Sequence, residues 1–254
     1  MKRFSQFFLI SLLLVGVVML FSMPKISSAS DMDTAKKLFE ERADLDKAKQ
    51  GVDLFQKIID KDPKNFEARE LQARLIIWLA MALGMQPDGM MEAVEYLSLA
   101  SEVTDNWLKV QPDAVAPNFW RGYAAAASKD VNSFNLYMSK AIKIDPNYFG
   151  GMPMTLMGYL KGMLPPFMGG DKVEAYKLID QALEASPDDI NIHRIKATIL
   201  LADIKDMAKK AIVHLQFAID SPKKVGQEPE QERDKVEAKK MMDADGEALK
   251  ALAK

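Results

Sequence analysis

The residues that most often carry chemistry are scarce in this chain, which has two histidines, His193 and His214, and no cysteine. Neither histidine stands in the His-x-x-x-His or Glu-x-x-His spacing that places two metal ligands on one helix face. His193 is expected to be a solvated residue near a helix start. No serine lies in a Gly-x-Ser-x-Gly setting, and no Gly-x-x-x-x-Gly-Lys phosphate loop occurs. We therefore expect no metal, no cofactor and no enzymatic activity.

The chemistry that remains is recognition by apolar side chains, and one stretch is built for it. Between Phe149 and Gly170 the chain has five methionines and six glycines. Methionine is flexible and suits irregular apolar surfaces, whereas glycine weakens a helix and needs a reason. We hypothesise that an apolar cavity or partner surface is lined by part of this stretch, namely Met152, Met157, Tyr159, Phe167 and Met168. The alternative is a tightly packed inner helix in which methionine fills gaps.

Two further aromatic residues, Trp120 and Tyr123, are candidates for the same role. Either could line a ligand site, but a core built from packed helices also needs large residues at such positions. Both interpretations stay open. In the Met/Gly stretch, Gly158 and Gly162 are four residues apart and share a helix face, so a neighbouring element is expected to approach closely there.

The elements that position these residues are predicted from prolines at regular intervals. Pro63, Pro112, Pro146, Pro187 and Pro222 lie 49, 34, 41 and 35 residues apart. Before Pro187 the helix that starts at Asp171 carries Ala175, Ile179 and Ala182 on one face. Small residues there allow close helix packing, and the proline ends the helix. This pattern resembles the closing half of a tetratricopeptide (TPR) unit, whose period is about 34 residues.

The two long intervals contain loop-like insertions at 84–89 and 164–170. In the second insertion, Gly169 and Gly170 end one helix and Asp171 begins the next as its N-cap, with Glu174 three residues later. The fold class is therefore predicted to be all-α, a TPR-like superhelical stack of about ten to twelve antiparallel helices. Residues 31–222 form the repeat domain, and 223–254 are a linker and a charged C-terminal helix that caps the stack.

Residues 1–30 are predicted to be a signal peptide. Lys2 and Arg3 precede an apolar run that ends near Phe21, and small residues surround Ala29, where cleavage is expected. An uncleaved anchor is the alternative. Without these residues the formal net charge changes from −2 to −5, because they contain three basic residues and no acidic one. An acidic chain disfavours nucleic acid as a partner, and the signal indicates a soluble periplasmic protein that cannot be a lipoprotein.

Around Trp120-Arg121-Gly122, and above all from Leu164 through Pro165 and Gly169-Gly170-Asp171 to Ala175 and Ala182, the chain resembles the T component of tripartite ATP-independent periplasmic (TRAP) transporters. The resemblance spans about residues 65–220. It implies a TPR-like accessory protein that docks a periplasmic solute-binding protein, assembles as a trimer and has an apolar pore or groove through its fold. An apolar small ligand along the surface lined by Met152–Met168 is part of the same functional hypothesis. Members of that family are often lipoproteins, and this chain lacks the cysteine. The alternative function is a general envelope scaffold that binds peptide segments of an assembly complex.

Overall fold

The computed structural model describes residues 28–202 and 208–252. These residues form eleven α-helices and one 3₁₀ turn, with no strand among them. The all-α prediction is confirmed. The helices are α2 (Ser28–Glu40), α3 (Leu45–Lys61), α4 (Phe66–Gly84), α5 (Met90–Val110), α6 (Val115–Ala127), α7 (Val131–Ile144), α8 (Tyr148–Met163), α9 (Lys172–Ala185), α10 (Ile190–Leu201), α11 (Ala208–Asp220) and α12 (Glu228–Leu252), and the 3₁₀ turn is η1 (Pro166–Met168).

Helix starts follow from side chains in the sequence itself. Five helices begin with a side chain that accepts a hydrogen bond from a backbone N–H of the first turn, and these residues are Asp44, Asn65, Asp130, Asp171 and Asp189. The first N–H groups of a helix have no carbonyl partner within it, and these side chains satisfy them. Asp171 was the predicted cap. The carboxylate of Asp171 accepts from Glu174 N over 3.0 Å. The backbone N–H of Asp171 donates to the carbonyl of Lys161 instead of to the side-chain carboxylate of Glu174.

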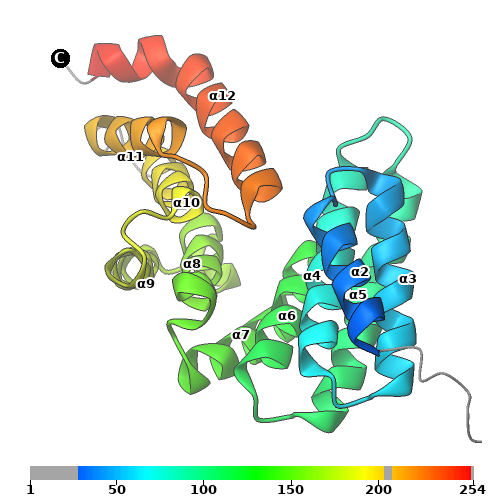
Figure 1. The fold of residues 1–254 in the computed structure, drawn as a ribbon. Helices are drawn as coiled ribbons and strands as arrows, with labels where there is room; N and C mark the ends of the chain where they lie inside the picture. The colour runs from blue at the N-terminus through cyan, green and yellow to red at the C-terminus, as the bar shows by residue number, and fades with distance from the viewer. Residues whose placement is uncertain (1–27, 203–207, 253–254) are drawn as a thin grey trace, which may run out of the picture.

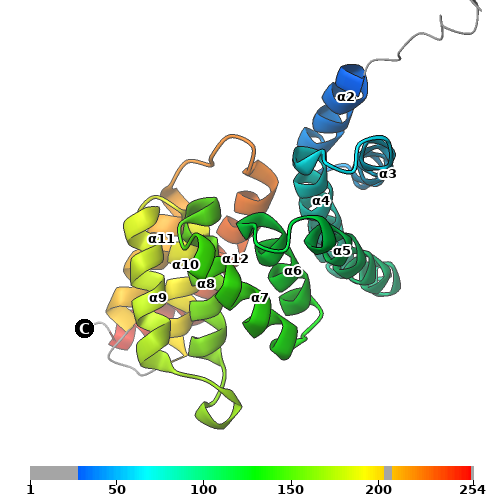
Figure 2. The ribbon, with the colours of Figure 1, turned by 90° about the horizontal axis from the view of Figure 1, so that it is seen from below.

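The helices pair in chain order: α2 with α3, α4 with α5, α6 with α7, α8 with α9, and α10 with α11. Figure 1 and Figure 2 show these pairs following one another along a curved stack. The even-numbered helices also contact the next even-numbered helix along the chain, from α2 to α12. They therefore form one continuous inner row, and the odd-numbered helices pack behind it.

The face predicted for the helix before Pro187 lies at the centre of this packing. Ala175, Ile179 and Ala182 of α9 are all fully buried. A Cβ built on Gly158 of α8 would lie 2.9 Å from Ile179 Cγ1, so no larger residue fits between α8 and α9. On the same face of α8, a Cβ on Gly162 would lie 2.9 Å from the side chain of Ile199 in α10. The expected close approach at both glycines is confirmed.

The ends of the stack differ from the predictions in detail. α2 begins at Ser28, three residues before the predicted domain start at 31, and the rest of the predicted signal peptide lies outside the described residues. α12 lies within the predicted linker and C-terminal helix at 223–254, and Ala238 packs with Ile190, Leu215 and other residues of α10 and α11. No described helix combines the length and apolar character that crossing a membrane requires.

Candidate functional site

A pocket of about 80 Å³ opens on the inner row of helices. Its walls come from α4, α6, α8, α10 and α12, so it lies where the superhelix is concave. One wall is apolar and consists of Ile77, Trp78, Met81, Trp120, Tyr123, Phe149 and Met152. The other is polar and consists of Arg74, Asp189, Asn191, Gln227, Glu230, Gln231, Arg233 and Asp234.

The apolar wall rests on a cluster of aromatic rings around the fully buried Phe119. The ring centroid of Trp120 lies 4.7 Å from that of Phe119 and 5.6 Å from that of Phe149, edge-on in both cases, an arrangement that aromatic pairs favour. Trp120 Nε1 donates to Tyr148 Oη over 3.1 Å, and Tyr148 Oη donates to Glu70 Oε1 over 2.8 Å. Burial and the neighbouring Glu70 carboxylate raise the pKa of Tyr148. The phenol therefore stays neutral, and it donates to Glu70 while its oxygen accepts from the indole N–H.

Phe149 reaches the pocket through an unusual backbone. Phe149, Gly150 and Gly151 have φ values of 49°, 69° and 82°, in the left-handed region that costs a residue with a Cβ about 1–2 kcal/mol. Gly151 also needs the space, because its Cβ would lie 3.1 Å from Ala182 Cα. The regular turns of α8 begin only after this run, which explains how Pro153 is tolerated in its first turn. The strained turn places the Phe149 ring 4.9 Å from the Arg74 guanidinium carbon.

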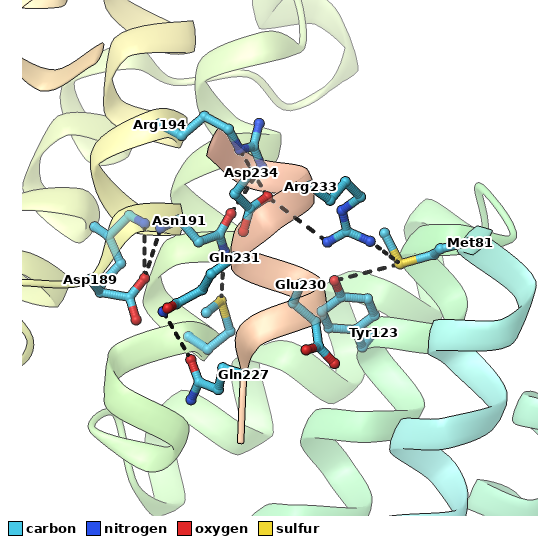
Figure 3. Close-up of polar contacts among 12 residues, drawn as sticks. Met81, Tyr123, Asp189, Asn191, Arg194, Gln227, Glu230, Gln231, Arg233 and Asp234 are labelled. Atoms are coloured by element: carbon cyan, nitrogen blue, oxygen red, sulfur yellow. Dashed lines mark hydrogen bonds and ion pairs between the residues drawn. The ribbon is translucent and has the colours of Figure 1, made fainter. Parts of the chain in front are cut away.

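The polar wall is made largely by the chain's own C-terminal part. We define residues Gly226–Asp234 as the groove segment; it comprises the end of the linker and the first turns of α12. In Figure 1 this end of α12 lies between α10 and α4. Figure 3 shows the segment running past Asn191 and Tyr123, with Asp234 directed to Arg194 and Arg233 directed to Met81. A helix predicted to cap the stack thus also enters its concave face.

Arg42, in the turn between α2 and α3, holds the middle of the groove segment. Its Nε and Nη2 atoms donate to the two carboxylate oxygens of Glu230 over 3.1 and 2.5 Å. Nη2 also donates to the carbonyl of Gly226, and Nη1 to the carbonyl of Phe39. The side chain of Arg42 is only 1% exposed and that of Glu230 31% exposed. Paired, charge-assisted contacts of this kind fix orientation as well as adding energy.

Asp234 holds the other end of the groove segment. Its carboxylate accepts from Arg194 Nε over 3.1 Å, and the Arg233 guanidinium lies 3.9 Å away. Burial raises the pKa of Asp234, and the two arginines oppose that effect. Arg194 also donates to Asn191 Oδ1, and Asn191 donates to Met152 Sδ over 3.4 Å. The polar wall and the apolar wall are therefore connected through Asn191.

The structure divides the residues predicted to form a binding surface into three groups. Trp120, Tyr123 and Met152 line the pocket together. Met157 is buried in the core, with 6% of its surface exposed. Tyr159, Phe167 and Met168 are 39%, 88% and 54% exposed and belong to the later part of α8 and to η1, outside the pocket lining. The Met/Gly stretch consequently does not form one continuous lining.

The residues predicted as structural motifs occupy turn and packing positions. Gly169 has a φ of 93°, which favours glycine, and a Cβ on Gly170 would lie 1.8 Å from the carbonyl oxygen of Leu164. Asp171, Ala175 and Ala182 cap and pack α9 as described above. Pro187 follows the end of α9, and its carbonyl oxygen lies 2.8 Å from His193 Nε2.

The two histidines meet, which the sequence did not indicate. His193 Nδ1 and His214 Nδ1 are 2.7 Å apart, and the His193 ring stacks on Phe217 with centroids 3.9 Å apart. The expectation that His193 is simply solvated was wrong, because α10 and α11 pack side by side. Within the described residues, no three His, Cys, Asp or Glu side chains are placed to hold a metal ion.

The groove residues that the sequence analysis missed are Arg42, Arg74, Arg194, Glu230 and Asp234. Their contacts join positions up to 188 residues apart, so no local pattern identifies the partners. The only signal in the sequence is that Glu230 and Asp234 are four residues apart and share a helix face.

Comparison with known proteins places the fold among TPR proteins. The chain resembles the crystal structure of TTC0263, a thermophilic TPR protein of Thermus thermophilus. The TM-score is 0.55 at 14% identity, over 82% of this chain and 98% of that one. The MamA protein is also similar, with a TM-score of 0.42 at 14% identity over 79% of this chain and 92% of that one. No protein-family model matches the chain, and no curated protein matches it in sequence. The fold is therefore a TPR-like helical repeat.

Proposed function

We propose that this chain is a non-enzymatic scaffold of the cell envelope that binds a partner protein on its concave face. The observation that carries the proposal is the pocket on the inner row of helices, where an aromatic wall faces a polar wall. Solenoid proteins present extended concave surfaces to their partners. The proposal is also supported by the chain's own groove segment, which lies on this face and is held there by charged and polar contacts.

The size of the pocket favours a side chain over a free ligand. Pockets for small organic ligands are commonly about 300–1,000 Å³, whereas this one is about 80 Å³. An apolar ligand held by Trp120, Tyr123 and Met152 is therefore a small one or, by preference, an apolar side chain of the partner.

The particular role that we propose is that of a transporter accessory protein, the T component of a TRAP-type system, which docks a periplasmic solute-binding protein. Its support is the resemblance carried by Leu164, Pro165 and Gly169-Gly170-Asp171. Trimeric assembly belongs to the same resemblance. The second candidate is a general envelope scaffold for peptide segments of an assembly complex, and the peptide-like groove segment favours it.

Export to the periplasm is part of this proposal and rests on residues 1–30. Sequencing the N-terminus of the protein recovered from its host checks it. A mature chain that starts near residue 30 or 31 is expected. Recovery of the chain in the membrane fraction with Met1 retained would mean that the segment is an anchor.

The binding role is tested with a solute-binding protein encoded beside this chain's gene, if the host has one. Calorimetry should detect binding to the mature chain. Trp78 is a half-buried residue of the pocket wall. Trp78→Ala should weaken that binding at least about 10-fold, as expected for an aromatic hot spot. Leu136→Ala, on an exposed position of α7, is the matched control. Equal affinity of both variants for the solute-binding protein would show that the concave face is not the docking site.

A further inference from the structure

The two halves of α12 are held in different ways. Ala238, Met241 and Met242 pack with Ile190, Ala197, Leu215 and Ala218, so an apolar cluster fixes the later half to α10 and α11. The groove segment contains Pro229 as its only apolar residue besides Gly226, and it is held by ion pairs and hydrogen bonds. The first half of α12 therefore has no apolar cluster of its own to hold it in the groove.

The groove that faces this segment is locally basic, although the chain as a whole is acidic. Arg42 is paired with Glu230 and Arg194 with Asp234. The guanidinium of Arg74 also lines the pocket and lies against the Phe39 and Phe149 rings. If the segment left, Arg42 and Arg194 would lose their carboxylate partners, and charge-assisted pairs of this kind are among the stronger hydrogen bonds. The emptied groove therefore favours another segment that brings two carboxylates.

The groove segment also leaves the pocket partly unfilled. Gln227, Gln231 and Asp234 face Trp120, Phe149 and Met152 across about 80 Å³, and glutamine offers these rings little apolar contact. A segment with the same carboxylates and one apolar side chain directed at this space would bury more apolar surface than the chain's own residues do. The added apolar burial would strengthen binding of such a competitor. This gain offsets the high local concentration of the chain's own tethered segment.

Building on the proposed concave-face function, we infer that the groove segment occupies the partner's binding site when the partner is absent. The partner inserts an acidic helical segment with two carboxylates four residues apart, which pair with Arg42 and Arg194, and with an apolar side chain that enters the pocket. The chain's own segment must be displaced for this segment to bind. The site is therefore self-occluded and selective for acidic helices.

The test uses a fluorescent peptide with the sequence of residues 224–238 carrying Gln227→Leu, so that it keeps both carboxylates and adds an apolar side chain. Fluorescence anisotropy measures its binding to the full mature chain and to a chain with Glu230→Gln and Asp234→Asn. The altered chain should bind the peptide at least about 10-fold more tightly, because its own segment competes less well. A peptide in which Glu230 and Asp234 are also replaced by Gln and Asn should bind the altered chain at least about 10-fold more weakly.

Any of three results would overturn the inference. One is equal affinity of the peptide for the unchanged and the altered chains. Another is equal affinity of the acidic and the neutral peptides for the altered chain. Dimerisation of the unchanged chain through exchanged segments would also overturn it, since the occupant would then be a second copy. If the double variant does not fold, Asp234→Asn alone replaces it, with hydrogen exchange of residues 226–234 as the measure of release. Faster exchange together with tighter peptide binding is the expected result, and unchanged exchange and binding contradict the inference.

These outcomes are separate from those of the proposed function. If the peptide binds the opened groove but the solute-binding protein does not bind the chain, the transporter role fails and the self-occluded acidic-helix site stands. If the solute-binding protein binds the unchanged and the altered chains equally well, docking stands and self-occlusion is wrong.

Discussion

The guanidinium of Arg42 meets both carboxylate oxygens of Glu230, although the two residues are 188 positions apart in the chain. This contact joins the turn between α2 and α3 to α12 across the concave face. Arg42 is almost fully buried, and it uses its remaining donors on the carbonyls of Phe39 and Gly226. The contact therefore fixes how far the groove segment enters the stack.

Replacing this arginine is expected to destabilise the protein. Arg42→Met should lower the free energy of unfolding by about 2–3 kcal/mol, somewhat less than is typical for a fully buried pair, because Glu230 is about one third exposed. Urea denaturation measures the change. Lys47→Met is the control, since its pair with Glu41 is exposed and such surface pairs contribute little to stability. Equal losses for the two variants would mean that the contact is no stronger than a surface pair.

Close packing of α8 against α9 predicts that Gly158 cannot be enlarged. Gly158→Val should lower the free energy of unfolding by about 1–3 kcal/mol, because the added atoms meet Ile179 and the backbone oxygen of Ala175. Gly84→Ala is a matched glycine control, since its Cβ would lie 3.7 Å from Ala93 Cβ in ordinary contact. Thermal denaturation compares the two. A Gly158→Val protein that melts like the unchanged chain would show that the helices separate easily.

The separation of the methionines into buried and exposed groups gives a third prediction. Met157→Gln should cost about 2–5 kcal/mol, as expected for disruption of a buried side chain. Met168→Gln, at a position that is 54% exposed, should change stability by less than about 0.5 kcal/mol. Chemical denaturation of both variants tests this. Similar losses in the two proteins would contradict the assignment of Met157 to the core and Met168 to the surface.

The His193–His214 pair predicts a loss of stability in mild acid. Burial, with smaller contributions from Lys196 and His193, lowers the pKa of His214 to about 4, and burial also lowers the pKa of His193. In the unfolded chain these imidazoles have a pKa of about 6.5. Between those values it binds more protons than the folded chain, so the stabilisation is present above about 6.5 and is lost as pH falls towards 4.

Because both rings are partly solvated, the expected loss is about 1–2 kcal/mol between pH 6.5 and 4.5. Denaturation at several pH values measures it, with His214→Gln as the comparison that isolates these groups from the carboxylates. Nearby Asp180, Asp188 and Asp189 also act on the pair and are present in both proteins. A His214→Gln chain with an unchanged pH slope would contradict the prediction.

The sequence by itself determined the helices and their order. Proline positions, acidic N-caps such as Asp130 and Asp171, and the small face of Ala175 and Ala182 act within one or two turns of the residue concerned. Local interactions of this kind can be recognised from spacing alone. The spacing of Gly158 and Gly162 likewise predicted a close approach, though not that Ile179 and Ile199 would be the contacts.

The tertiary structure decided which residues share a surface. Met152 and Met157 are five positions apart on α8, which places them on different faces, so one lines the pocket and the other enters the core. Arg42 meets Glu230, and His193 meets His214, only because the superhelix brings distant turns together. Such pairings depend on the summed curvature of the whole stack, and no short stretch of sequence encodes that curvature.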